Sequence, residues 1–235
     1  MRRVWLEQCS IEEGKIHWPT EHEGIPPASQ FISSPYDPQA HYARKYTNSW
    51  IGYKVHLTET CEEDLPNLIT NVATTAAPIA DGDSTKSIHE SLKKKDLLPS
   101  THIVDTGYVD AKLLVTSQKN FGVNLLGPTR PDYKWQAKAQ QGFAAEYFQV
   151  DWQKQHLICP EGKISTSWSA YTHPNGKEMV KIKFAQKDCI AGPSTRPDSG
   201  VRKSWSKCTT AARRTVTLRK EEHHQALLAA RTREN

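Results

Sequence analysis

Strict alternation of side chains from residue 49 to residue 59 constrains the fold of this chain more than any other feature. Apolar and more polar residues interleave there: Ile51, Tyr53, Val55 and Leu57 alternate with Trp50, Gly52, Lys54, His56 and Thr58. Alternate side chains of a β-strand point to opposite faces, so the pattern predicts one apolar face and one more polar face. The next β-type run, Leu68–Thr75, follows a polar loop that contains Pro66. We therefore predict an antiparallel hairpin with a long connection.

Helical and β-type segments alternate after this hairpin. Ser84 is placed to cap a helix from about Thr85 to Lys95, whose Lys-rich end suits the helix dipole. A short apolar run at Ile103–Val104 is followed by a helical pattern over 109–119 and a β-type run over 122–128. This order predicts a mixed α/β fold with helices packed on a mixed sheet. The handedness of parallel crossovers places Ile103–Val104 beside the hairpin.

The composition of successive stretches predicts how the chain is divided. Residues 1–48 are rich in helix breakers and are expected to form an extended arm, while residues 49–128 form the mixed sheet. Short β-type runs and an Asn-Gly turn signal over 129–189 predict a small antiparallel β-insertion. Residues 190–214 are expected to be an irregular linker. Residues 215–235 are expected to form a short strand and a truncated C-terminal helix.

Bulk properties exclude some classes of protein and leave others open. The 235 residues suit one large domain or one domain with an insertion, and the net charge of +5 permits a polyanionic partner without demanding one. No apolar run approaches the roughly 20 residues that span a bilayer, and no signal-peptide core follows the N-terminus. Five scattered cysteines, an odd number, indicate a reducing compartment. We therefore expect a cytoplasmic protein that does not interact with a membrane.

Asp105 is the first candidate for chemistry. It closes the Ile103–Val104 run and precedes Thr106 and Gly107, where the backbone must turn. A carboxylate at a strand end lies at the rim of a sheet, where α/β enzymes place catalytic groups, and hard divalent cations prefer carboxylate oxygens. An Asp before a turn is also an ordinary capping residue, and local chemistry alone favours that interpretation.

Two further groups of residues carry weaker signals. Arg44 and Lys45 lie among aromatic side chains, which suits contact with a phosphate backbone but equally suits a solvated loop. Cysteine and histidine residues in the second half could bind zinc, although no Cys-x-x-Cys pair is present and free thiols are the simpler interpretation. The members of this second group are Cys159, Cys189 and Cys208, with His156 or His173.

The chain resembles the DDE transposases of bacterial insertion sequences. The stretches that carry the resemblance occur in the same order as in that family: Ser34–Ala40, Trp50–Cys61, Val104–Tyr108, Leu126–Pro128, Cys159–Gly162 and Phe184–Cys189. The resemblance implies an RNase H-like fold interrupted by a β-rich insertion, so residues 49–128 would be a partial RNase H-like core. It also implies DNA transposition through three carboxylates that bind Mg²⁺ or Mn²⁺. Asp105 matches the second of them, in an Asp-x-Gly-Tyr context.

The sequence also departs from the family pattern. The first catalytic Asp of the family lies upstream of the matched region, and the catalytic Glu lies beyond the Ala229–Arg231 region. Gly192 stands where the family places the partner of Cys189, which argues against zinc. We therefore expect a truncated portion of a transposase that is inactive alone, because one carboxylate cannot hold two metal ions.

The resemblance also predicts partners and leaves alternatives open. The expected partner is DNA at transposon ends, with the protein associated with the bacterial nucleoid. An absent first strand would leave a sheet edge open, which predicts marginal stability and self-association. The alternative from another class is a non-catalytic DNA-binding or regulatory fragment that uses Arg44, Lys45 and Lys54. A translated remnant without a role is a third interpretation.

Overall fold

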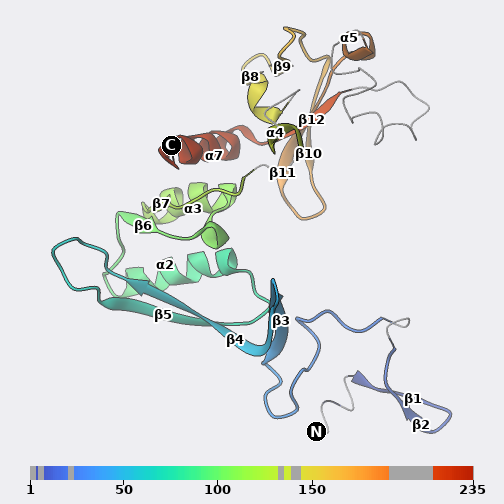
Figure 1. Ribbon diagram of the computed structural model, residues 1–235, viewed down its shortest axis with the longest axis vertical. Coiled ribbons are helices and arrows are strands. Elements are labelled where there is room, and N and C mark those ends of the chain that lie inside the picture. The colour runs from blue at the N-terminus through green and yellow to red at the C-terminus, as the bar shows by residue number, and fades with distance from the viewer. Residues whose placement is uncertain are drawn as a thin grey trace. The chain divides into compact units, whose positions relative to one another are not determined.

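The protein has a mixed α/β fold, as predicted (Figure 1). The computed structural model describes residues 4, 8–20, 24–131, 135–138, 144–190 and 214–234. These residues divide into two compact units. The first comprises Met1–Val109 with Thr116–Leu126, and the second comprises Asp110–Val115 with Gly127–Asn235.

The largest sheet of the first unit contains the predicted hairpin. Strands β3 (His41–Lys45), β4 (Asn48–Glu59) and β5 (Ile69–Ala76) pair antiparallel in the order β3-β4-β5. The ladder places Tyr53 opposite Ala76 and Leu57 opposite Val72. The long β4–β5 connection is therefore confirmed.

Residues 1–48, predicted as an extended arm, contain three short strands. Strands β1 (Ser10–Glu12) and β2 (Lys15–His17) form a separate small hairpin, and β3 pairs with the first half of β4. These strands have three to five residues each. So short a strand shows too few alternations for its period to be recognised in the sequence.

The elements after β5 contain a further small sheet, of strands β6 and β7. After η1 (Asp81–Ser84) and α2 (Thr85–Lys94), strand β6 (Thr101–Ile103) leads through η2 (Thr106–Tyr108) and α3 (Ala111–Phe121) to β7 (Asn124–Leu126). Strands β6 and β7 pair parallel, with Ile103 opposite Leu126. The predicted position of Ile103–Val104 beside the hairpin is wrong, since β6 shares no ladder with β4 or β5 in the described residues. Strand β6 is only three residues long, and it forms its ladder hydrogen bonds with β7, the strand that follows α3.

The two faces of the β4–β5 pair have opposite environments. The polar face is covered: His56, Thr58 and Asn71 are buried, and Asn71 accepts hydrogen bonds from Ser91 of α2 (2.8 Å) and from the Lys95 ammonium (2.9 Å). Figure 1 shows α2 lying along this pair of strands. The apolar side chains of β4 point to the other face and remain exposed. Helix α2 thus packs on the polar side of the sheet.

The second unit has a β-rich core, as predicted for the insertion. Strands β8 (Gln149–Asp151) and β9 (His156–Ile158) form one antiparallel pair. Strands β10 (Ser167–Thr172), β11 (Glu178–Lys183) and β12 (Thr215–Arg219) form an antiparallel sheet in that order. Gly176 has φ of +76° in the β10–β11 turn, a backbone conformation that glycine adopts without strain.

Strand β12 belongs to the same sheet as the insertion, although it follows the expected linker in sequence. Its Leu218 joins the buried cluster of this unit, whose members are Phe148, Leu157, Val180, Ile182, Phe184 and Leu218. Helix α7 (Glu221–Glu234) follows β12 directly. Shorter elements are α4 (Trp135–Lys138), η3 (Ala145–Tyr147) and α5 (Gln186–Ile190). The predicted irregular linker over 190–214 falls almost wholly outside the described residues.

Candidate carboxylate site

Asp105 lies where strand β6 turns into η2. The Val104 N–H still donates to the Leu126 carbonyl (2.8 Å), so the strand-like pairing continues up to the residue before the carboxylate. The Asp105 side chain then accepts a hydrogen bond from the Gly107 N–H and caps η2. The capping interpretation is therefore confirmed. The carboxylate of Asp105 is also exposed at the strand end, which is the position that the catalytic interpretation requires.

A second carboxylate, that of Asp81, approaches Asp105 from η1. Gly107 lies close to both: a Cβ atom at this position would stand 2.9 Å from Asp105 Oδ1 and 3.1 Å from Asp81 Oδ2. The two oxygens are therefore no further apart than the sum of these distances. A side chain at residue 107 would force one or both carboxylates to shift.

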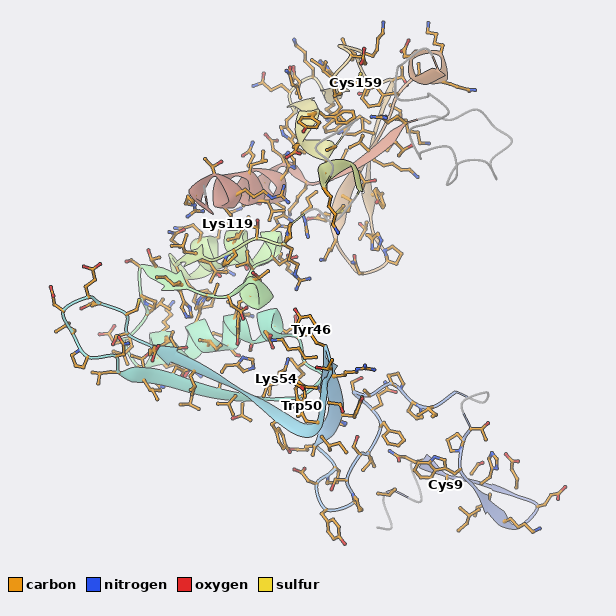
Figure 2. All side chains as sticks on the ribbon, in the orientation of Figure 1. Cys9, Tyr46, Trp50, Lys54, Lys119 and Cys159 are labelled. Carbon is orange, nitrogen blue, oxygen red and sulfur yellow. The ribbon has the colours of Figure 1, made fainter. Side chains whose placement is uncertain are left out.

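Lys54 compensates part of the negative charge of this pair. Its Nζ lies 2.6 Å from Asp81 Oδ1 and also donates to the Ile79 carbonyl. Lys54, labelled in Figure 2, extends from the polar face of β4. The ammonium and the Asp81 carboxylate are each about one quarter exposed, so this ion pair is partly shielded from solvent. Oδ2, the other oxygen of Asp81, is the one that faces Gly107.

Tyr108 borders the carboxylate pair, and its hydroxyl is fixed by a hydrogen bond with His56. Its hydroxyl shares a hydrogen bond with Nδ1 of the buried His56, and Nε2 of His56 lies 2.9 Å from the Thr75 hydroxyl. The Tyr108 and His56 rings meet edge to face at 5.7 Å between centroids. Burial raises the pKa of the Tyr108 hydroxyl, and the negative charges of Asp81 and Asp105 raise it further. The tyrosine is thus held neutral next to the two acids.

The pair has the chemistry of half of a metal site. Carboxylate oxygens suit hard divalent cations such as Mg²⁺ and Mn²⁺, and Mg²⁺ commonly takes one or two protein carboxylates and completes its shell with water or phosphate. The uncovered space at Gly107 is consistent with one such ion between Asp81 and Asp105. Within the described part of the chain, no group of three or more His, Cys, Asp or Glu side chains could hold a metal ion.

The predicted DNA-binding residues divide between two environments. Arg44 and Lys45 are exposed at the end of β3, where Arg44 Nε donates to the Tyr46 carbonyl (3.0 Å). Lys54 is instead engaged by Asp81. The structure therefore brings Lys54 to the carboxylate pair, and it leaves Arg44 and Lys45 together at the β3–β4 turn.

The zinc candidates are only partly described. Cys159 is a free thiol, and His156 Nε2 lies 3.9 Å from Asp151 Oδ2. His173 Nδ1 accepts from the Asn175 N–H (3.3 Å) in the β10–β11 turn. Cys208 and the side chain of Cys189 lie outside the described residues.

Sequence reasoning identified Asp105 and missed its neighbours Asp81, His56 and Tyr108. The Asp81-Gly82-Asp83 segment reads as a turn, which conceals the role of its first carboxylate. A usable signal was present in β4, because Lys54 and His56 recur with a period of two on the covered face. Buried charged or titratable groups need partners, which the sequence does not identify.

Comparisons with protein-family models, with curated proteins and with solved structures found no match.

Proposed function

We propose that the chain is a DDE-type transposase or a fragment of one, which contributes part of the metal-binding site for DNA transposition. The observation that carries this proposal is the approach of Asp81 and Asp105 at Gly107. Carboxylates from separate elements that converge at a strand end are the arrangement on which metal-dependent phosphoryl transfer relies. The resemblance of the Asp105-Thr-Gly-Tyr segment to the family supports the same reading.

Each residue of the site has a part in this proposal. The Gly107 N–H orients the Asp105 carboxylate, and the Lys54 ammonium holds Oδ1 of Asp81 so that Oδ2 faces the space at Gly107. A divalent cation supplies polarisation of a phosphodiester oxygen and a more acidic bound water. Tyr108, whose neutral hydroxyl shares a hydrogen bond with His56, borders this space.

Two carboxylates can bind one divalent ion, but they are too few to bind the two ions of a two-metal mechanism. A catalytic centre with two metal ions about 3.5–4 Å apart requires further acidic ligands. The proposal therefore assigns metal binding to this chain and assigns catalysis to an assembly in which additional carboxylates are present. Association with DNA in the bacterial nucleoid follows from the same proposal.

Metal binding by the chain tests the proposal directly. Isothermal titration with Mn²⁺ should show one site in the wild-type protein, and Asp105→Asn or Asp81→Asn should weaken it at least about tenfold, as the loss of one charged ligand removes a strong interaction. Asp83→Asn is the matched control, since Asp83 is an exposed acid on the same turn as Asp81. Equal Mn²⁺ affinity in all four proteins would refute the proposed site.

A non-catalytic DNA-binding fragment is the alternative, and the exposure of Arg44 and Lys45 favours it. If these residues contact phosphates, replacing both by Ala should reduce the slope of log affinity against log salt by about 1.8. Lys93→Ala, at the exposed end of α2, serves as the control. Gel-shift titrations of duplex DNA at several salt concentrations measure this slope. If the slope of log affinity against log salt is unchanged in the Arg44/Lys45 variant, these two residues do not contact phosphates.

A further inference from the structure

Within the described residues of the first unit, one apolar face is covered at one end and exposed along the rest. We define the β4–β5 apolar face as Tyr53, Val55, Leu57, Ile69 and Val72. These side chains lie on one side of the sheet, because Leu57 is directly opposite Val72 and Glu59 directly opposite Ile69 in the ladder. Val55, Leu57 and Ile69 are 61%, 62% and 61% exposed. Alternating strands normally bury such a face.

The sheet cannot bury this apolar face by packing it on α2 in place of the polar face. Its other side is occupied by buried His56, Thr58 and Asn71, and the α2 contacts of Asn71 fix which face points inward. A slip of the β4–β5 register by one residue would bury the apolar side chains only by exposing these hydrogen-bonded groups. The exposure is therefore a consequence of the fold and not of one loose side chain.

The chain itself covers one end of the face. The Tyr53 hydroxyl donates to the Asp37 carboxylate (2.8 Å), and Ile32 is buried in the same region. Ile32, Tyr53 and Ala76 line a hollow of about 700 Å³ between the segment around residues 29–41 and the sheet. At its Tyr53 end, the face is thus already covered by the segment around residues 29–41. Further along the face, Val55, Leu57 and Val72 are 61%, 62% and 58% exposed.

We propose that a second copy of this chain covers the exposed remainder of the β4–β5 apolar face. Five half-exposed side chains of this size offer on the order of 500 Å², near the upper end for the largest apolar patch of a monomer. A standard interface buries about 800 Å² on each partner, of which somewhat more than half is apolar. The patch therefore has the size of the apolar centre of one dimer interface. This inference is independent of the proposed function.

The composition of the face suits pairing with an identical face. Tyr53, Val55 and Leu57 are uncharged, as are the β5 residues opposite them, and the one charged side chain of the ladder on this side, Glu59, lies at the end of β4. Two copies can therefore meet through the centre of the face without burying a charge. Sheets pack face to face about 10 Å apart at roughly −30°, with interdigitated side chains. A two-fold axis makes such a contact self-complementary and closed.

Charges at the two ends of the hairpin agree with a two-fold arrangement. Strand β4 begins beside the basic residues Arg44 and Lys45 and ends before the acidic loop Glu62–Asp64. A two-fold axis across the face reverses β4 of the second copy. The acidic end of one copy then lies toward the basic end of the other, which favours this orientation over the parallel one.

Sedimentation velocity of the full chain over a range of concentrations tests the dimer. We expect a concentration-dependent dimer in the wild type, and at least about tenfold weaker association in the double variant Val55→Lys/Leu57→Lys, which places two charges in the interface. Leu97→Lys is the matched control, since Leu97 is a 49% exposed apolar residue outside the face. It should associate as the wild type does.

Thermal unfolding distinguishes the alternatives. Because Val55 and Leu57 are exposed in the single chain, the double variant should unfold at the same temperature as the wild type at concentrations where both are monomers. A monomeric wild type with a strongly destabilised variant would mean that another segment of the same chain covers the face. A dimer that the substitutions leave intact would mean edge-to-edge strand pairing. Either result overturns the proposal.

Discussion

At the scale of single residues, Gly107 determines whether the two acids can act together. It carries no side chain at the point where the Asp81 and Asp105 oxygens converge. The turn does not require a positive φ at this residue, because Gly107 is not among the glycines with that conformation. An added methyl group would therefore crowd the two carboxylates without straining the backbone, which makes it an informative probe.

We predict that Gly107→Ala weakens Mn²⁺ binding at least about tenfold while the chain stays folded. The new Cβ would contact Asp105 Oδ1 at 2.9 Å and Asp81 Oδ2 at 3.1 Å. Carboxylate ends can swing away at little cost to the fold, but the displaced oxygens then lose their common position. Isothermal titration measures the affinity and circular dichroism checks the fold. Unchanged Mn²⁺ affinity would show that the ion, if bound, lies elsewhere.

At the scale of elements, α2 and β6 are joined by a pair of histidines. His89 of α2 is fully buried, its Nε2 lies 3.0 Å from Nδ1 of His102 on β6, and Phe121 of α3 meets its ring edge to face. Its Nδ1 has no hydrogen-bond partner within the described residues. Burial, and then the neighbouring His102, lower the pKa of His89 to about 4, and burial lowers the pKa of His102.

This pair predicts that the protein loses stability on acidification. The folded-state pKa of His89 lies below the usual 6.5, so between those values the unfolded chain binds a proton that the folded chain does not. The contribution of His89 to the free energy of unfolding is therefore fully present above pH 6.5. The free energy of unfolding falls by up to about 3 kcal/mol as the pH drops toward 4. Urea unfolding at a series of pH values measures this dependence.

The control for this prediction compares two histidines. His89→Leu should flatten the dependence between pH 6.5 and 4, whereas His173→Gln, at an exposed turn, should leave it unchanged. A slope that persists in His89→Leu would assign the acid sensitivity to other groups.

Asp110 anchors the start of α3 within the second unit. Its carboxylate accepts from the Lys112 N–H (2.9 Å), as an N-cap does, and it lies 3.1 Å from Arg219 and 3.4 Å from Lys177. Burial raises the pKa of Asp110, but the Lys112 hydrogen bond and the charges of Arg219 and Lys177 outweigh burial and lower it on balance. Asp110 is therefore the cap of α3 and has two cationic partners.

We predict that Asp110→Ala lowers the free energy of unfolding by about 1–2 kcal/mol, since a lost N-cap typically costs about 1 kcal/mol. Asp110→Asn retains an oxygen for the cap and removes the charge, so it should cost less than half as much. Thermal unfolding of both variants separates capping from the ion pairs. Equal losses in Ala and Asn would assign the whole effect to the charge.

At the scale of the whole molecule, stability depends on a core in each unit, and that of the second unit is the clearer one. Phe184 is 1% exposed there and lies 5.9 Å from Phe148 between ring centroids. We predict that Phe184→Ala costs about 3–5 kcal/mol, because it leaves a large cavity. Tyr36→Ala, at a 93% exposed position, should change the free energy of unfolding by less than about 0.5 kcal/mol. Urea unfolding compares the two. A loss below 1 kcal/mol in Phe184→Ala would mean that this core forms only weakly.

In the described part of the chain, no helix is long and apolar enough to cross a bilayer. The features that bear on function are instead a partly neutralised acidic site and an exposed apolar sheet face.

Local pattern was sufficient to predict the longer elements of this protein and missed the short strands β1, β2 and β3. The alternation in β4, the helix over α2 and the Asn-Gly turn before β11 all depend on residues that are neighbours in sequence, and all are present. Only the tertiary structure decided which face of β4–β5 is buried, that β6 pairs with β7, and that Asp81 meets Asp105. The physical reason is common to the three: each depends on contacts between segments far apart in the chain. Alternation reveals that a strand has an apolar face, but not whether any other part of the molecule covers it.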